Sequence, residues 1–140
     1  FAYLIEEMTG NVNVIKRDGA KHSIIQTENH LPKGEAGAGA DIHLSPDEQF
    51  LYVSQRSNST LQIFKVNAKD GKIKYVGEQS TLGNFPRNFT IHPSGAYLLA
   101  ANQKSNDITV FKRNKKTGLL TDTRQRIKVG SPVCLQWIGN

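Results

Sequence analysis

The chain has 140 residues, of which 37% are hydrophobic and 21% charged, values that suit a soluble globular protein and exclude a disordered tail. No apolar run approaches the roughly 18 residues that span a bilayer, so no membrane segment or membrane partner is expected. The formal charge is +6, but the basic residues are dispersed beside turns and along strands. No basic helix or aromatic RNA-reading motif accompanies them, so nucleic acid is not expected as a partner.

Two further features concern the setting and the completeness of the chain. Its single cysteine, Cys134, cannot form an internal disulfide, which favours a reducing, cytoplasmic location. The chain begins at Phe1 in a strand-like run without an initiator Met, so we expect sequence to be missing upstream.

Alternating apolar and polar residues predict strands along the whole chain, and these strands repeat. In chain order they fall at 1–7, 11–16 and 21–26, then at 40–46, 50–56, 60–65 and 72–78, then at 87–93, 97–103, 107–112 and 119–129, and last at 133–138. The segments 1–7, 50–56 and 97–103 align without gaps, and their starts lie 49 and 47 residues apart. A Gly-containing turn precedes the most polar strand of each unit, which suits a hairpin that ends in an outer edge strand.

Four antiparallel strands repeated at this spacing predict an all-β fold, a partial β-propeller of four-stranded blades. We expect a blade lacking its first strand at 1–33, complete blades at 39–80 and 86–129, and the first strand of a closing blade at 131–140. Propellers usually have about 4 to 8 blades, so about two and a half blades cannot close a ring. The chain is therefore expected to be the C-terminal portion of a longer propeller.

One rim of a propeller collects the loops that enter the first strand and those that join the second to the third, and function usually lies there. Glu7, Arg56 and Gln103 occupy equivalent positions on that rim, at the end of each second strand. Packing alone does not explain three different polar residues at one repeat position. A functional role and ordinary solvated turns are equally good explanations.

The first strands place polar residues on one face in all three copies, namely Asp41 and His43, Asn88 and Thr90, and Cys134 and Gln136. Arg87 directly precedes Asn88 at the rim. Alternative interpretations are a structural, hydrogen-bonded role for His43 and an inter-blade salt bridge for Arg87. The four scattered histidines show no metal-ligand spacing, so no metal or cofactor is expected.

Several runs of this sequence resemble the lactonase-type seven-bladed propellers, a family that includes bacterial 6-phosphogluconolactonase and the fungal carboxymuconate-lactonising enzyme. The runs are 40–47, 50–56, 85–93, 98–103 and 130–134, and their order and spacing cover nearly the whole chain. The resemblance implies that further blades lie upstream, and that the active rim carries Arg, Glu and His from successive blades. By motif, these match Glu7, Arg56 and His43, and the Pro-Arg-Asn run adds Arg87 and Asn88.

Hydrolysis of a sugar lactone needs a positioned water, a base and donors for the developing oxyanion. Glu7 is the only carboxylate at the rim position and is the expected base, with Arg56 stabilising the oxyanion or holding a substrate anion. His43 can orient a partner or carry a proton, and Arg87, Asn88 and Gln103 are expected to bind substrate. These roles can be exchanged among the groups, and upstream blades can supply others.

The best single substrate inferred from the resemblance is 6-phosphogluconolactone. Two other hypotheses stay open: a non-catalytic propeller used for binding or scaffolding, and an anion- or nucleic-acid-binding surface. Enzyme function predicts that Glu7, Arg56 and His43 converge on one cleft, whereas a scaffold leaves them scattered or paired off. As an isolated chain, it is expected to associate with its missing blades or with copies of itself through its open blade faces.

Overall fold

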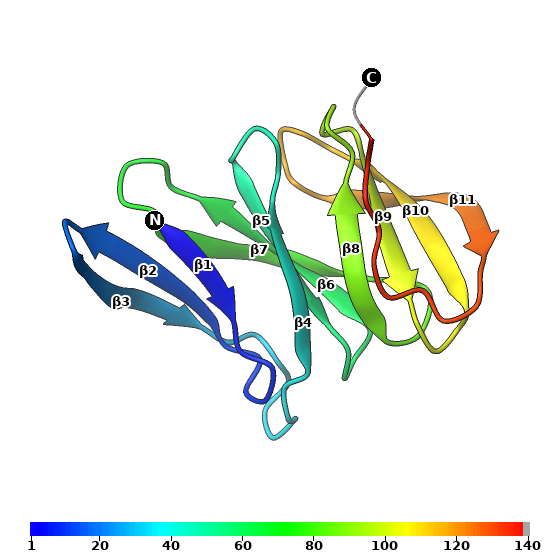
Figure 1. Ribbon diagram of the computed structural model, residues 1–140, viewed down its shortest axis with the longest axis horizontal. Coiled ribbons are helices and arrows are strands. Elements are labelled where there is room, and N and C mark those ends of the chain that lie inside the picture. The colour runs from blue at the N-terminus through cyan, green and yellow to red at the C-terminus, as the bar shows by residue number, and fades with distance from the viewer. Residues whose placement is uncertain (139–140) are drawn as a thin grey trace.

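The structure is a computed structural model that describes residues 1–138, and every regular element in that range is a β-strand (Figure 1). The strands are β1 (Ala2–Ile5), β2 (Val12–Asp18), β3 (Lys21–Glu28), β4 (Gly39–Leu44), β5 (Phe50–Gln55), β6 (Thr60–Val66), β7 (Ile73–Ser80), β8 (Pro86–Ile91), β9 (Tyr97–Asn102), β10 (Asp107–Arg113) and β11 (Leu120–Lys128). They form three antiparallel sheets in the orders β1-β2-β3, β4-β5-β6-β7 and β8-β9-β10-β11. The prediction of an all-β, partial propeller is confirmed.

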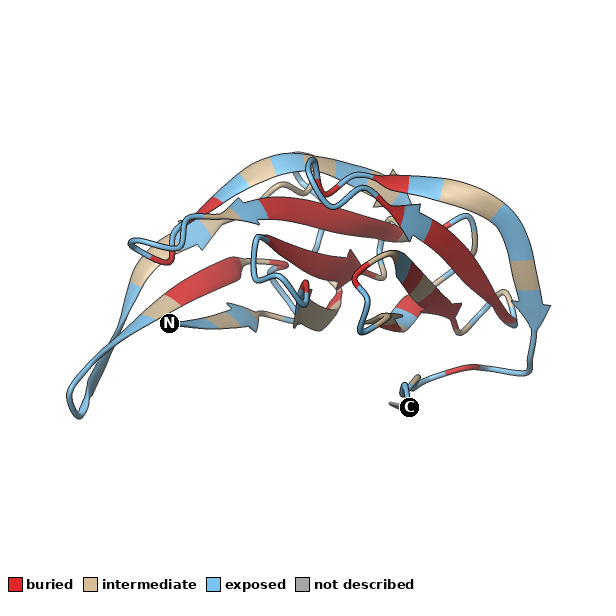
Figure 2. Cartoon of the chain, turned by 90° about the horizontal axis from the view of Figure 1, so that it is seen from above, coloured by how far each residue is buried: buried red, intermediate tan, exposed pale blue. Residues whose placement is uncertain are grey.

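The three sheets lie side by side, with β1, β4 and β8 as the inner strands that face one another (Figure 1). The first sheet has three strands and the other two have four. The outer strands β3, β7 and β11 carry mostly exposed side chains, whereas β5, β6 and β10 are almost wholly buried (Figure 2). This contrast matches the expectation of polar outer strands, because an outer strand has no neighbour to cover it.

Residues 133–138, expected as the first strand of a closing blade, form no strand in the described part of the chain. A strand needs a hydrogen-bonded neighbour, and none of the described strands pairs with residues 133–138. The segment instead runs extended beside β8 (Figure 1), where the Leu135 backbone N–H donates to Asn88 Oδ1 at 2.7 Å. Residues 139 and 140 of the predicted strand lie outside the described residues.

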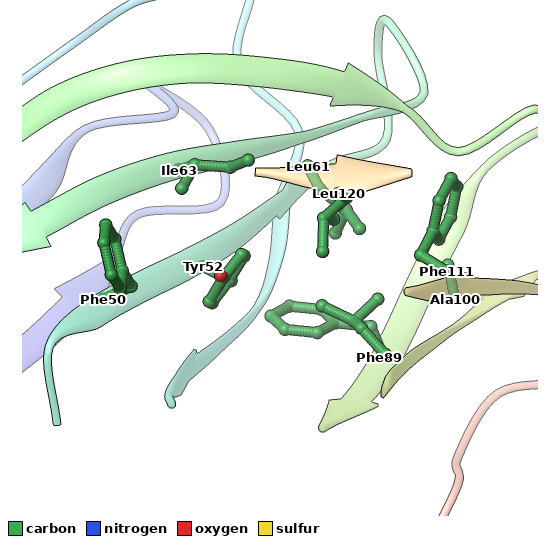
Figure 3. Close-up of a cluster of buried hydrophobic side chains, with 9 residues drawn as sticks. Phe50, Tyr52, Leu61, Ile63, Phe89, Ala100, Phe111 and Leu120 are labelled. Atoms are coloured by element: carbon green, nitrogen blue, oxygen red, sulfur yellow. The ribbon is translucent and has the colours of Figure 1, made fainter. Parts of the chain in front are cut away.

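Two hydrophobic clusters fill the spaces between neighbouring sheets. The cluster between the second and third sheets contains large aromatic side chains from both, including Phe50, Tyr52, Phe89 and Phe111 (Figure 3). The cluster between the first and second sheets is smaller and is built from β2, β5, β6 and β7. Each sheet is therefore stabilised by apolar surface that only its neighbour can cover.

A repeated hydrogen bond ties each sheet to the outer hairpin of the next. The Tyr52 hydroxyl donates to the Gly118 carbonyl at 2.6 Å, and the equivalent Tyr3 hydroxyl donates to the Gly71 carbonyl at 2.9 Å. Arg113, whose side chain is fully buried, donates to the Tyr52 hydroxyl at 2.8 Å and pairs with Asp47 of the second sheet at 3.0 Å. The contacts place the third sheet against the second in a fixed orientation.

Gly118 can be tested against Gly19 because both have a positive φ, 76° and 60°, but different surroundings. A Cβ on Gly118 would lie 2.4 Å from the Phe50 ring, whereas a Cβ on Gly19 would meet nothing within 4 Å. In the full protein we expect Gly19→Ala to lower the free energy of unfolding by about 1 kcal/mol from backbone strain alone. Gly118→Ala should cost at least about 2 kcal/mol more, from overpacking against Phe50. Equal losses in urea unfolding would contradict this account of the inter-sheet contact.

Candidate functional site

A cleft of about 350 Å³ opens where the inner strands of the three sheets meet, and all three sheets contribute to its lining. Its walls are formed by Ile5, Glu7, Gly39, Ala40, Asp41, Arg56, Arg87, Asn88 and Val133. Four of the six predicted site residues are in this set, namely Glu7, Arg56, Arg87 and Asn88. The rim predicted from the repeat therefore corresponds to a cleft in the structure. This cleft lies between successive sheets and not within one sheet.

Backbone irregularities shape the cleft from two of the inner strands. The pairing of β8 with β9 shifts register between Pro86 and Asn88, so that Arg87 is the extra residue on the inner strand. β4 has a corresponding shift against β5, between Gly39 and Ile42. Such bulges bend a strand and redirect a side chain, and here they lie where Ala40, Asp41 and Arg87 line the cleft.

Glu7 and Arg56 form an ion pair across the boundary between the first and second sheets, from Arg56 Nη2 to Glu7 Oε1. The Arg56 side chain is only 11% exposed, and its guanidinium also donates to the Ala38 and Gly39 carbonyls at 3.2 and 3.3 Å. Glu7 is 65% exposed, and among the described residues no hydrogen bond reaches its second oxygen, Oε2. Arg56 is thus held rigidly, while Glu7 keeps one carboxylate oxygen facing solvent.

Phe85 supports Arg56 from the third sheet's entry loop. Its ring centroid lies 5.1 Å from the Arg56 guanidinium carbon, within range of a cation–π contact. Phe85 has a φ of 64°, which is unusual for a bulky residue, and its carbonyl accepts the Gln103 backbone N–H at 3.0 Å. Strained backbone of this kind is common at functional sites, and here it positions an aromatic ring on a buried arginine.

Arg87 supplies a second positive charge to the cleft. The residue is exposed, and among the described residues its side chain makes no hydrogen bond or ion pair. The hydrogen bond and charge of Arg56 hold the pKa of Glu7 below its ordinary value, and the charge of Arg87 lowers it further. The site therefore combines an ionised carboxylate with one paired and one unpaired guanidinium, a combination that favours an anionic ligand.

Asp41 is the residue that the sequence reasoning left out of the site. It lines the cleft, and its Oδ2 accepts hydrogen bonds from Asn88 Nδ2 at 2.6 Å, the Phe89 N–H at 3.0 Å and His43 Nε2 at 3.0 Å. Burial raises the pKa of Asp41, but the hydrogen bonds from His43 and Phe89 outweigh burial and hold that pKa below its ordinary value. The sequence showed Asp41 on the polar face of a first strand, but not that three donors from two sheets converge on it.

Two predicted site residues do not line the cleft. His43 is not among the lining residues; its ring is edge-on to Phe89 at a centroid distance of 4.9 Å, and its Nε2 contacts the Asp41 carboxylate at 3.0 Å. Gln103 contacts the entry loop through its backbone, and its side chain is not part of the lining. No group of three potential metal ligands occurs within residues 1–138, and in that range no helix is long and apolar enough to cross a membrane.

Comparison with known proteins identifies the class. The fold is that of a β-propeller, and the family described as "Lactonase, 7-bladed beta-propeller" matches residues 1–137. The chain therefore belongs to the lactonase family of seven-bladed β-propellers.

Relatives and solved structures agree with this family. The 6-phosphogluconolactonases of Formosa agariphila and Bacillus subtilis are 37% and 30% identical over 97% and 99% of this chain. A putative 6-phosphogluconolactonase from Bacteroides fragilis superposes over 98% of the chain with a TM-score of 0.92 at 42% identity. A periplasmic gluconolactonase from Pseudomonas aeruginosa gives the same TM-score and coverage at 34% identity. The chain spans only 39% and 41% of the two sequence relatives, and 38% and 39% of the two solved chains.

The electrostatic coupling in the cleft can be measured without any substrate. Replacing Arg56 by Gln removes the hydrogen bond and the charge that lower the pKa of Glu7, so that pKa should rise toward its ordinary value. Arg87→Gln should raise it by less, because Arg87 acts through charge alone. Carboxyl-carbon NMR titration of Glu7 provides the measurement, with the exposed Lys16→Gln as the control. An unchanged titration in Arg56→Gln would show that the ion pair does not form in solution.

Proposed function

We propose that the intact protein hydrolyses a sugar lactone, with 6-phosphogluconolactone as substrate and 6-phosphogluconate as product. The observation that carries this proposal is the convergence of Glu7, Arg56 and Arg87 on one cleft, in a chain of the lactonase family. Relatives of this chain bear the name 6-phosphogluconolactonase, which supports the same substrate.

The proposed reaction uses Glu7 as the general base. Its solvent-facing Oε2 takes a proton from a water molecule as the water oxygen attacks the lactone carbonyl carbon. The carbonyl oxygen becomes an oxyanion, which the nearby guanidinium groups stabilise. When the intermediate collapses, the bond from the carbonyl carbon to the ring oxygen breaks, and the ring oxygen takes the proton that Glu7 removed from the water. The leaving oxygen becomes a hydroxyl group, Glu7 is again ionised, and the new carboxylic acid loses its proton to solvent.

Arg87 is assigned to the substrate's phosphate because it has no partner among the described residues and is exposed at the cleft. Arg56, already paired with Glu7 and tied to two carbonyls, is assigned to the oxyanion, where a rigid donor is most effective. His43 is assigned an orienting role through Asp41, because it does not itself line the cleft. Substrate binding by Gln103 stays a prediction without structural support.

A non-catalytic propeller is the main alternative, and the pairing of Glu7 with Arg56 is the observation that favours it. A scaffold would use that pair only to hold neighbouring blades together. The free Oε2 of Glu7 and the exposed Arg87 favour catalysis instead, since neither contributes a contact between blades. A surface for nucleic acid would require strong salt dependence of binding, which an assay over a range of ionic strength would detect.

The described chain also needs partners for its end sheets. Leu4 and Ile24 of the first sheet are 46% and 59% exposed, and Tyr97 and Ile127 of the last sheet are 44% and 48% exposed. We propose that the other blades of the intact protein cover these surfaces, and that the isolated chain self-associates instead. A monomeric 15.5 kDa species in sedimentation experiments would contradict that proposal.

A cytoplasmic location is likewise proposed, on the single cysteine alone, and cell fractionation tests it.

The catalytic roles predict large losses of activity in the intact protein. Glu7→Gln should reduce kcat for 6-phosphogluconolactone by about 100-fold or more, because the base is lost while shape is kept. Arg56→Ala should cause a similar loss through the missing oxyanion donor. Rates are corrected for spontaneous ring opening, and exposed Glu35→Gln serves as a matched control for loss of a carboxylate. Wild-type rates in both rim variants, with a folded protein, would exclude these roles.

The pH dependence separates Glu7 from His43 as the base. Because Arg56 and then Arg87 lower the pKa of Glu7, kcat/KM should fall on the acid side only below the ordinary glutamate pKa. Arg87→Gln should move this acid limb to higher pH, since one positive charge is removed. An acid limb near the ordinary histidine value of about 6.5 would assign the base to histidine instead.

A further inference from the structure

The inner strands contain a second repeated contact, which joins consecutive sheets beside the cleft. Asp41 and Asn88 occupy equivalent positions in β4 and β8, 47 residues apart. Asp41 Oδ2 accepts the backbone N–H of Phe89 in the next sheet at 3.0 Å. In the same way, Asn88 Oδ1 accepts the backbone N–H of Leu135 in the following segment at 2.7 Å. In each case the acceptor side chain belongs to the preceding repeat. Its equivalent residue in the donor's own repeat lies one position before the donor.

The two contacts are linked because the Asn88 carboxamide takes part in both. Its Nδ2 donates to Asp41 at 2.6 Å, while its Oδ1 accepts from Leu135. Both ends of this side chain are therefore engaged within the protein, which leaves it poorly placed to act as a direct substrate ligand. The chain of contacts runs from Asp41 in the second sheet, through Asn88 in the third, to the segment 130–138.

The contacts lie next to two residues that line the cleft. Asn88 directly follows the bulged residue Arg87, so fixing the Asn88 side chain restrains the strand where Arg87 enters the cleft. Leu135 lies two residues beyond Val133, which supplies the wall contributed by the last segment. Within the described residues this segment is attached to the third sheet by two backbone N–H groups, Ser131 to Asn106 Oδ1 at 2.8 Å and Leu135 to Asn88 Oδ1 at 2.7 Å.

We propose that Asp41 and Asn88 are positioning residues, which fix Arg87 and the segment 130–138 as walls of the substrate cleft. As far as it concerns the lactone, the proposal rests on the proposed function, and it replaces the predicted role of Asn88 in binding substrate directly. We call the chain of contacts from Asp41 through Asn88 to Leu135 the relay. Asp41 begins the relay and also aligns His43, whose Nε2 lies 3.0 Å from the same carboxylate oxygen.

An ionised carboxylate suits the position of Asp41 because only donors surround it. Its Oδ2 faces three donors, and its Oδ1 accepts the backbone N–H of Ile42 at 2.9 Å. An asparagine of the same shape has one oxygen and one NH₂ group, so either orientation sets a donor against a donor. Asp41→Asn therefore disrupts the relay while hardly changing the volume of the side chain.

The test compares Asp41→Asn and Asn88→Ala with Thr90→Val in the intact protein. Thr90 lies on β8, the strand of Asn88. Among the described residues its side chain makes no hydrogen bond, and it does not line the cleft. One readout is hydrogen–deuterium exchange at the Leu135 amide, the donor to Asn88, resolved by mass spectrometry with fragmentation. The other is KM and kcat for 6-phosphogluconolactone. Circular dichroism checks folding, and Asn88→Ser replaces Asn88→Ala if the latter does not fold.

In both relay variants we expect exchange of the Leu135 amide to be up to about tenfold faster, the effect of losing one hydrogen bond. We also expect kcat/KM to fall about tenfold, mainly through a higher KM, because Arg87 is no longer fixed. Thr90→Val should match the wild type. Among the described residues Asp41 makes no hydrogen bond to Leu135, so an effect of Asp41→Asn on the Leu135 amide must pass through β8, which Asp41 contacts at Asn88 and Phe89.

Wild-type exchange in Asp41→Asn would overturn the relay. A raised KM in Asn88→Ala with unchanged exchange would make Asn88 a direct ligand and would also overturn it. If the wild-type protein hydrolyses no lactone, the proposed function fails, and the exchange measurement alone then decides whether the relay exists.

Discussion

The structure depends on the fact that each sheet can be buried only by the sheets on either side of it. A twisted four-stranded sheet has two faces to cover, and here no helix covers either face within residues 1–138. The apolar clusters between the sheets provide the free energy of burial, but apolar packing alone does not fix the orientation of one sheet on the next. Directional bonds from one sheet to the backbone of the next supply that orientation. The tyrosine hydroxyls do so at the outer hairpins, and Asp41 and Asn88 do so at the inner strands.

This arrangement explains why the cleft is built from single residues of successive sheets. Glu7 ends a strand of the first sheet, Arg56 ends the equivalent strand of the second, and Arg87 enters the third. A repeated backbone therefore brings three different charged side chains to one place without any long loop. Their chemistry depends on how accurately the sheets are placed, because the ion pair between Glu7 and Arg56 crosses a sheet boundary. The hydrogen bonds at the outer hairpins and those beside the cleft therefore both fix the relative positions of the charged cleft residues.

The repeat made most of the fold predictable from sequence. Alternation within strands and the superposition of 1–7, 50–56 and 97–103 led to the three sheets and to the rim that holds Glu7 and Arg56. Contacts between sheets were beyond this reasoning, because a strand pattern shows which face a side chain occupies but not which neighbour it meets. For that reason Asp41 was placed on the polar face but was given no role, and His43 was expected in the cleft although it is not among the lining residues. The segment 133–138 has a strand's sequence but lacks a partner strand in the described chain, so its pattern alone could not make it a strand.

The central claim is that the cleft between these sheets binds and opens a phosphorylated sugar lactone. The most direct test is a crystal structure of the intact protein with 6-phosphogluconate, the proposed product. The account predicts that the phosphate contacts Arg87, that the new carboxylate lies between Glu7 and Arg56, and that Asn88 keeps its bonds to Asp41 and Leu135. Product bound elsewhere, or a cleft filled by side chains of another blade, would contradict it.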